Sequence, residues 1–159
     1  MASITIRPAT PSDIGTILGF IRELAEYERA PQEVVATPES LREHLFGPRP
    51  ACEAVIGEID GVARGFALYF HNFSTWKGRP GLYLEDLYVQ PASRGAGLGK
   101  ALFRRVASVA IQRRCPRMQW VVLDWNKPAI DFYSAMGAVA MDEWTTYRLT
   151  GDALARAGG

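Results

Sequence analysis

Apolar and polar residues follow two periods along the chain, one typical of helices and one typical of strands. Apolar residues recur every third or fourth position in four segments, and two of these begin at a Thr-Pro pair, which is typical of a helix N-terminus. Alternating or continuous apolar runs indicate strands. The predicted helices cover residues 11–25, 38–46, 98–114 and 128–136. The predicted strands cover residues 4–7, 51–59, 62–73, 82–89, 118–123 and 139–149.

The order of these segments predicts a mixed α/β fold. Asp60-Gly61 joins two strands as a two-residue hairpin, so those strands should pair antiparallel. The segment 82–89 is almost continuously apolar, which is typical of a central, buried strand, and only Glu85 and Asp86 interrupt it. The first helix is expected to leave Arg22, Glu23 and Glu26 toward solvent. Without repeats or a linker, residues 1–159 are expected to form a single domain.

Composition narrows the possible function classes. A net charge of +1 argues against nucleic-acid binding, which depends on many basic side chains facing phosphates. No apolar run approaches the roughly 20 residues that cross a bilayer, and the N-terminus lacks a secretory apolar stretch, so we expect a cytoplasmic protein with no membrane partner. Cys52 and Cys115 lie far apart without metal-like spacing, so neither a disulfide nor a metal site is expected.

The most informative segment is the glycine-rich turn before the third predicted helix. Gly95, Gly97 and Gly99 allow a sharp turn whose amide groups can approach an anion, and the helix dipole adds to that attraction. Arg94 and Lys100 can supply positive charge at its rim. The spacing fits neither a dinucleotide fingerprint nor a Walker loop. Taken alone, the pattern is equally consistent with a diphosphate site and with a plain structural turn.

The surrounding residues resemble a known family. Arg94-Gly95-x-Gly97-x-Gly99 follows a strand ending Asp86-Leu87-Tyr88-Val89, and Asn126-x-x-Ala129-x-x-Phe132-Tyr133-x-x-x-Gly137-Ala138 lies downstream. Together these two motifs resemble the acyl-CoA binding signatures of the GNAT superfamily of N-acetyltransferases. The resemblance implies a mixed, mostly antiparallel central sheet flanked by helices, and acetyl-CoA as co-substrate.

Four further motifs are similar to the spermidine/spermine branch of that superfamily, which includes enzymes that act on diamines and thialysine. They are Ile6-Arg7-Pro8-Ala9-Thr10, Glu23-Leu24-Ala25-Glu26-Tyr27-Glu28, Tyr83-Leu84-Glu85-Asp86 and Trp125-Asn126-Lys127-Pro128. The similarity runs from about residue 4 to residue 149, and the C-terminal tail matches poorly. It implies a small cationic amine as acceptor and a homodimer, because members of this branch are commonly dimers.

The resemblance also assigns residues to the co-substrate. They are Leu87, Tyr88, Val89, Arg94, Gly95, Ala96, Gly97, Leu98, Gly99, Lys100, Asn126 and Tyr133. Tyr133 is the expected acid that protonates the departing thiolate, although helix spacing alone would make it a core aromatic beside Phe132. Asn126 is expected to anchor the cofactor or the backbone, and its sequence context equally suits a helix start.

An alkyl ammonium with a pKa of about 10.4 is only about 0.04% neutral at pH 7, so the acceptor needs a base. We expect Glu85 to be that base, directly or through water, with Asp86 as its backup or as an anchor for the acceptor. Because side chains alternate along a strand, only one of the two can face the substrate unless a bulge intervenes.

The expected acceptor contacts are Tyr27, Glu28, Glu33, Trp76, Glu85 and Asp86, through carboxylate pairing and cation–π contact. By composition alone the first four are a solvated helix end and a loop aromatic, and the resemblance supports Tyr27 and Glu28 most. Asp86 is equally consistent with a carboxylate that only pairs with backbone or arginine.

Two alternative interpretations stay open from the sequence. The acceptor can instead be an amino acid, an antibiotic or a protein N-terminus. A protein of a different class, a non-catalytic acyl-CoA sensor, would also need the glycine turn, although it would not need both Glu85 and Tyr133.

Overall fold

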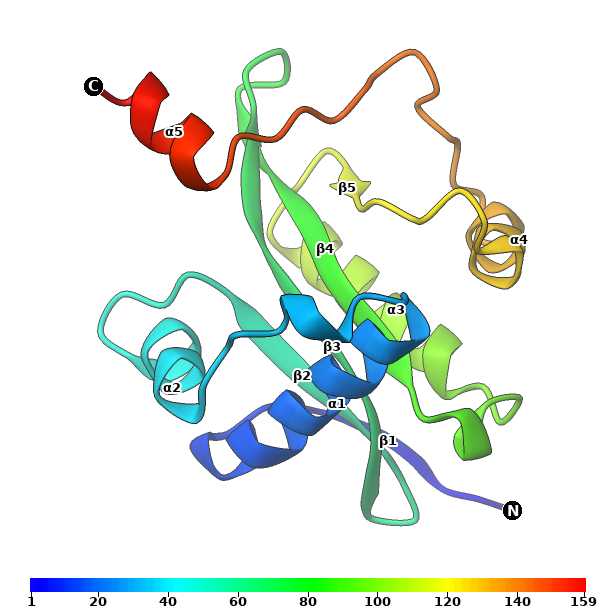
Figure 1. Cartoon of the computed structure of the whole chain (residues 1–159). Helices are drawn as coiled ribbons and strands as arrows, with labels where there is room; N and C mark the ends of the chain where they lie inside the picture. Colours follow the sequence, from blue (N-terminus) through cyan, green and yellow to red (C-terminus); the bar gives the residue numbers. More distant parts are fainter. The chain divides into compact units, whose positions relative to one another are not determined.

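The computed structural model describes all of residues 1–159 (Figure 1). Its internal contacts divide the chain into two compact units, Met1–Val121 and Val122–Gly159. The expectation of one domain over residues 1–159 stays a prediction. None of the helices combines the length and the apolar character that crossing a membrane requires.

The first unit is built from strands and three longer helices. Its strands are β1 (Ile4–Pro8), β2 (Glu53–Ile59), β3 (Val62–Ser74), β4 (Arg79–Val89) and β5 (Met118–Gln119). Its helices are α1 (Ile14–Tyr27), α2 (Pro38–Phe46) and α3 (Leu98–Gln112), with short 3-10 turns η1 (Pro11–Asp13), η2 (Pro31–Glu33) and η3 (Pro91–Ser93). The second unit contains α4 (Lys127–Ala135) and α5 (Gly151–Ala157).

The five strands form one sheet in the order β1-β2-β3-β4-β5. The first three pairings are antiparallel, and β4 pairs with β5 in parallel through Leu82 and Met118. The predicted hairpin is confirmed, because Ile59 pairs with Val62 across Asp60-Gly61. The predicted mixed, mostly antiparallel sheet flanked by helices is therefore confirmed.

Each face of the sheet carries its own apolar layer. On one face, Ile17 and Phe20 of α1 and Leu45 of α2 pack with alternate residues of β2, β3 and β4. On the other face lies α3, whose Leu98 and Leu102 approach Gly57 of β2 so closely that a side chain there would collide with them. Burial of these apolar side chains away from water supplies the main stabilisation of the unit.

Several predicted boundaries are wrong. The loop expected between residues 74 and 81 is only four residues long, because β3 and β4 continue pairing as far as Ser74 and Arg79. The sequence there is rich in turn formers, yet a ladder of backbone hydrogen bonds does not depend on side-chain type. The strand expected over 118–123 is limited to Met118–Gln119.

The second unit also differs from expectation. The segment 139–149 alternates as a strand in sequence, but it forms no β-pairing in the structure. Several of its large apolar side chains, including Trp144 and Tyr147, are exposed. The tail, for which no element was predicted, forms helix α5.

Candidate active site

The glycine turn lies at the end of β4 and leads into α3. Gly95 and Gly97 have φ values of 86° and 92°, a left-handed conformation that strains residues with a side chain. The turn is exposed, and the first-turn amide groups of α3, which begins at Leu98, have no acceptor within the helix. These donors at the positive end of a helix fit a diphosphate, as acetyl-CoA carries.

Arg94 joins this turn to the end of α1. Its guanidinium lies over the rings of Tyr27 and Tyr88, at 5.2 Å and 5.9 Å from their centroids, and its Nε donates to the carbonyl of Val89 at 3.0 Å. The hydroxyl of Tyr88 donates to Glu23 at 3.2 Å. A residue of the expected cofactor site therefore contacts Tyr27 of the expected acceptor site.

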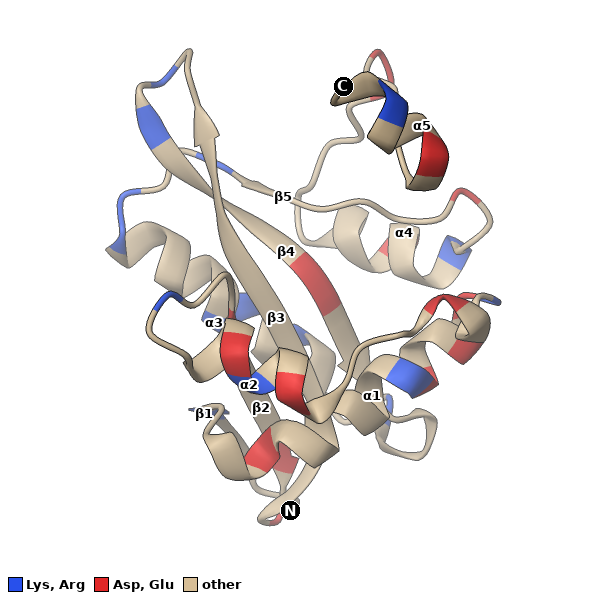
Figure 2. Cartoon of the chain, turned by 60° about the vertical axis from the view of Figure 1, so that its left-hand side comes forward, with Lys and Arg blue, Asp and Glu red and all other residues tan.

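A β-bulge interrupts β4 at the acidic pair. Tyr69 pairs with Leu84 and the preceding residue, Leu68, pairs with Asp86, so Glu85 is an extra residue without a partner on β3. A bulge of this kind re-aims side chains and suspends the strict alternation of faces. Figure 2 shows the pair as the acidic segment in the middle of β4. Because of this bulge, the carboxyl groups of Glu85 and Asp86 can both face one site.

Three carboxyl groups influence one another electrostatically around the bulge. Burial, together with the charges of Glu85 and Glu28, raises the pKa of Asp86 to about 7. Partial burial and the charge of Glu85 also raise the pKa of Glu28, which follows the last residue of α1. The structure therefore brings Glu28, Glu85 and Asp86 into one acidic cluster, and a neighbouring cation would favour their charged forms.

Two further residues of this region were not predicted from the sequence. Cys52 precedes β2, and burial with the charges of Glu53, Glu85 and Asp86 raises the pKa of its thiol. Glu23 does not simply face solvent as predicted, because it accepts hydrogen bonds from Tyr88 and from Gln90. Its position three residues after Phe20 and four before Tyr27 is the sequence signal that places it on the side facing the sheet.

Two expected acceptor contacts lie apart from the cluster. Trp76 lies in the turn of the β3–β4 hairpin and is 84% exposed. The six residue-to-residue steps from Arg79 to Glu85 span about 20 Å of strand, so Trp76 does not reach the acidic cluster of its own chain. Glu33 ends η2 and is exposed, and no interaction connects it with the three carboxyl groups.

The second unit holds Asn126 and Tyr133. Asn126 caps α4, since its side-chain oxygen accepts a hydrogen bond from the amide of Ala129 at 3.4 Å, as the helix-start interpretation expects. Tyr133 is half-buried on α4, and its ring lies edge-on to that of Phe132 at 5.4 Å. No group of three or more His, Cys, Asp or Glu side chains is arranged to hold a metal ion.

A mostly antiparallel sheet whose fourth strand carries an acidic bulge and runs through a glycine turn into a helix is the architecture of an acyl-CoA-dependent N-acyltransferase. The chain belongs to the acetyltransferase (GNAT) family, whose model matches residues 15–138. It is an acetyl-CoA-dependent N-acetyltransferase.

Individual relatives agree with this assignment. A thialysine N-epsilon-acetyltransferase of Bos taurus is 41% identical, covering 100% of this chain and 99% of the relative. The L-ornithine N5-acetyltransferase NATA1 of Arabidopsis thaliana is 32% identical, covering 94% of this chain and 85% of the relative. Among solved structures, integron cassette protein VCH_CASS6 from V. cholerae superposes with a TM-score of 0.81 at 26% identity, covering 98% of both chains. The predicted placement in the thialysine and diamine branch is confirmed.

Proposed function

We propose that this enzyme transfers the acetyl group of acetyl-CoA to a primary amine of a small acceptor that carries at least two positive charges. The observation that carries this proposal is the acidic cluster of Glu28, Glu85 and Asp86. The charge of Glu85 disfavours the ionisation of Glu28 and Asp86, and an occupant with more than one ammonium group would offset this repulsion best. The relatives named for thialysine and ornithine support a diamine or diamino acid as that occupant.

The cluster also supplies the base. A carboxyl group with a pKa near the working pH is well matched to accept a proton, and Asp86, at about 7, has this property. Glu85, the base expected from the sequence, lies on the exposed side of the bulge. In this proposal Glu85 and Glu28 hold the ammonium groups, and the amine proton passes to the Glu85–Asp86 pair, directly or through water.

The residues that bind the cofactor in this proposal lie at the C-terminal end of β4 and in the glycine turn that follows it. The amides from Gly95 to Lys100 bind the diphosphate, and Leu87, Tyr88 and Val89 line the path of the cofactor along the strand. Bound acetyl-CoA supplies the thioester carbonyl that the neutral amine attacks. Tyr133 donates its phenolic proton to the departing sulfur, because a phenol with a pKa of about 10 is protonated at neutral pH.

An acceptor panel tests the proposed class. Initial rates of CoA release would be measured with thialysine, ornithine, a diamine, a polyamine and the matching monoamine. We expect kcat/KM for the monoamine to be lower by about tenfold or more, which corresponds to at least about 1.4 kcal/mol. Equal kcat/KM for monoamine and diamine would contradict the charge requirement. Binding of acetyl-CoA without release from any acceptor would favour the sensor interpretation instead.

We also propose that the enzyme works as a homodimer in the cytoplasm. The free thiols of Cys52 and Cys115 agree with a reducing compartment. Exposed apolar side chains along 139–149 and at the β3–β4 hairpin offer area for a second copy. Since Trp76 does not reach the acidic cluster of its own chain, its expected contact with the acceptor requires the cluster of the partner.

Mixing two impaired variants tests this exchange of Trp76. Trp76→Ala and Asp86→Asn each remove one part of the shared site, but a mixed dimer keeps one complete site. If the subunits re-associate at random, activity should recover to roughly a quarter of the wild-type value, because half of the dimers carry one intact site of two. Activity equal to the average of the separate variants would show that Trp76 acts within its own chain or has no role.

A further inference from the structure

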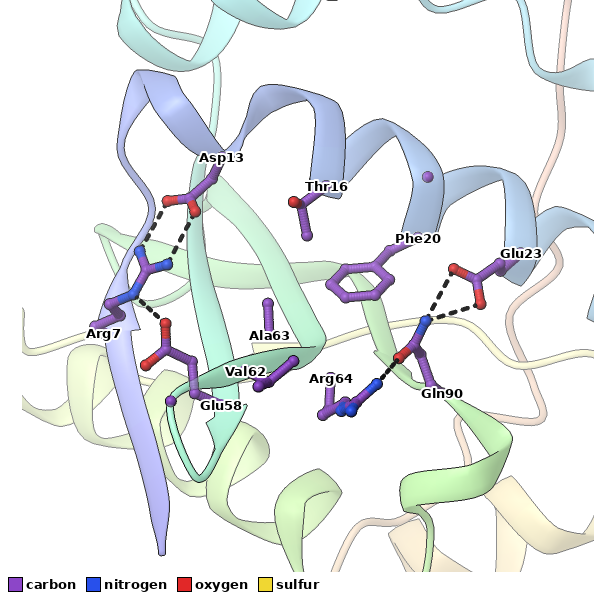
Figure 3. A pocket seen from close by; sticks show the side chains of 12 residues that line it. Arg7, Asp13, Thr16, Phe20, Glu23, Glu58, Val62, Ala63, Arg64 and Gln90 are labelled. Carbon is purple, nitrogen blue, oxygen red and sulfur yellow. Dashed lines mark hydrogen bonds and ion pairs between the residues drawn. The ribbon is translucent and has the colours of Figure 1, made fainter.

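Glu23 of α1 holds two residues at the C-terminal end of β4. The hydroxyl of Tyr88 donates to Oε1 of Glu23 at 3.2 Å, and Nε2 of Gln90 donates to Oε1 and Oε2 at 3.3 Å and 3.5 Å. Figure 3 shows Glu23, Gln90 and Arg64 as one row of hydrogen-bonded side chains beside an open depression next to α1. The row therefore connects α1 with the strand that leads into the glycine turn.

Tyr88 is a buried platform for Arg94. Its side chain is 4% exposed, and its ring lies 5.9 Å from that of Phe20 in the apolar layer under α1. Burial, together with the charge of Glu23, raises the pKa of Tyr88 to about 12, so the hydroxyl stays protonated and donates to the carboxylate throughout the neutral range. Packing fixes the body of this ring, and Glu23 fixes its hydroxyl end.

Gln90 fixes the start of the turn. It follows β4 directly, and its carbonyl accepts the amide of Ser93 at 2.9 Å where η3 begins. Its own amide donates to the carbonyl of Arg64 at 2.8 Å, and its Oε1 accepts from Nη1 of Arg64 at 3.4 Å. Glu23 accepts from the nitrogen of the same side chain. Both the main chain and the side-chain amide of Gln90 are therefore held where the chain enters the turn.

Arg94 follows this turn with its terminal nitrogens available. Its guanidinium lies over the rings of Tyr27 and Tyr88, and its Nε donates to the carbonyl of Val89. Neither Nη1 nor Nη2 has a hydrogen-bond acceptor within the protein. A guanidinium held in this way can donate two parallel hydrogen bonds to a phosphate. Its place depends on the ring of Tyr88 beneath it.

We infer that Glu23 is a positioning residue that orders the cofactor site before acetyl-CoA binds. It acts through Tyr88, which lies under Arg94, and through Gln90, which begins the turn. A carboxylate suits this role because it only accepts hydrogen bonds, and so serves a hydroxyl and an amide donor together. A site ordered in advance binds more tightly, since less freedom is lost on binding. The inference rests on the proposed function, in which the glycine turn binds acetyl-CoA.

Glu23→Gln tests this role with little change of shape. The new oxygen can accept from Tyr88, but the new amide nitrogen faces the amide nitrogen of Gln90, and two donors cannot bond. Turning the amide of Gln90 over would lose the bond from Arg64 instead. We expect the dissociation constant of acetyl-CoA, measured by calorimetric titration of the full chain, to rise about five- to tenfold.

Steady-state rates separate positioning from a role in the chemical step. In Glu23→Gln, the KM for acetyl-CoA should rise with the dissociation constant, and kcat at saturating acetyl-CoA should stay within about twofold of the wild type. This pattern is expected because the lost interaction strengthens binding of the ground state and the transition state alike. A fall in kcat with unchanged acetyl-CoA affinity would overturn the inference.

The double variant Glu23→Gln with Gln90→Glu provides the rescue. The glutamine on α1 then donates to a carboxylate at position 90, which still accepts from Arg64, so all three hydrogen bonds can form. Acetyl-CoA affinity should return to within about twofold of the wild type. Gln90→Glu alone sets two carboxylates face to face and should weaken binding. Glu26→Gln, an exposed change on the same helix, removes a charge but none of these hydrogen bonds and should bind like the wild type.

The outcomes distinguish this role from the proposed function. A wild-type chain that binds no acetyl-CoA would overturn both. Normal acetyl-CoA affinity in Glu23→Gln, beside normal affinity in the wild type, would overturn only the role of Glu23. A double variant that binds no better than Glu23→Gln, or an equal loss of affinity in Glu26→Gln, would also refute positioning through these hydrogen bonds.

Discussion

Asp86→Asn is expected to lower kcat by about 10²–10⁴-fold, the usual contribution of a positioned base, while making the protein more stable at alkaline pH. The stabilisation follows from the raised pKa of Asp86, about 7 in the folded chain against 3.8 ordinarily. Well below pH 3.8 the group is protonated in both states, and as the pH rises toward 7 mainly the unfolded chain releases the proton. Rising pH therefore lowers the stability of the folded chain, and asparagine, which does not ionise, removes this loss of stability.

The gain should be largest above pH 7 and small near pH 4, where the group is protonated in the folded chain and about half ionised in the unfolded chain. The difference between a pKa of about 7 in the folded chain and 3.8 ordinarily sets an upper limit of roughly 4 kcal/mol. For a chain of this size, each kcal/mol corresponds to about 2–4 °C in Tm. Thermal unfolding at pH 4 and pH 8 measures the effect. A variant that is less stable than wild type at pH 8 would contradict the assigned burial of the charge.

The pH–rate profile of Glu85→Gln then separates the two carboxyl groups. If Asp86 takes the proton, removal of the neighbouring charge lowers the pKa of Asp86, so the acid limb of kcat should move to lower pH. If Glu85 takes the proton, kcat should fall by about 10²-fold or more at every pH. Glu28→Gln is the matched control, because it removes the other charge that raises the pKa of Asp86 without altering the bulge.

Tyr133→Phe is expected to lower kcat by about 10²-fold or more and to leave the dissociation constant of acetyl-CoA nearly unchanged. Only the phenolic hydroxyl is lost, and the ring contact with Phe132 is preserved. Steady-state rates and calorimetric titration with acetyl-CoA measure the two quantities separately. Because proton donation to sulfur matters only as the thiolate departs, binding of the intact thioester should not depend on it.

Tyr147→Phe provides the control for this substitution. Tyr147 lies in the same unit and is 92% exposed, so loss of its hydroxyl should change neither kcat nor affinity. Full activity in Tyr133→Phe would remove Tyr133 from the proposed mechanism. A parallel loss of affinity and kcat would instead assign it to cofactor binding.

The sheet and helices could be predicted largely from the sequence, because periodicity and helix-start signals are local. The hairpin at Asp60-Gly61 and the helix after the glycine turn are correctly placed for this reason. The segment 139–149 has the alternation of a strand but no ladder, since a strand needs a neighbouring backbone, which alternation does not encode. The pairing that extends β3 to Ser74 and begins β4 at Arg79 was not predicted, because the sequence there is rich in turn formers and does not show that a neighbouring backbone lies alongside.

The candidate site was predictable in composition but not in geometry. The acidic pair stands out in an apolar strand, yet nothing in the sequence places a bulge at Glu85 rather than elsewhere. The environment of Asp86 depends on Glu28, which lies 58 positions earlier and meets β4 only through the fold. Glu23 was placed at the helix surface because its partners, Tyr88 and Gln90, are similarly remote in sequence.

Because Glu85 is the extra residue of β4, deletion of a single codon would convert the acidic bulge into an ordinary strand. Deletion of Glu85 would leave Leu84 opposite Tyr69 and Asp86 opposite Leu68 in unbroken alternation, so the apolar layers would keep their alignment. Such a chain would keep the glycine turn and lose the paired carboxyl groups. A homologue with that deletion could retain cofactor affinity without turnover, so inheritance of the glycine turn alone would not identify an active enzyme.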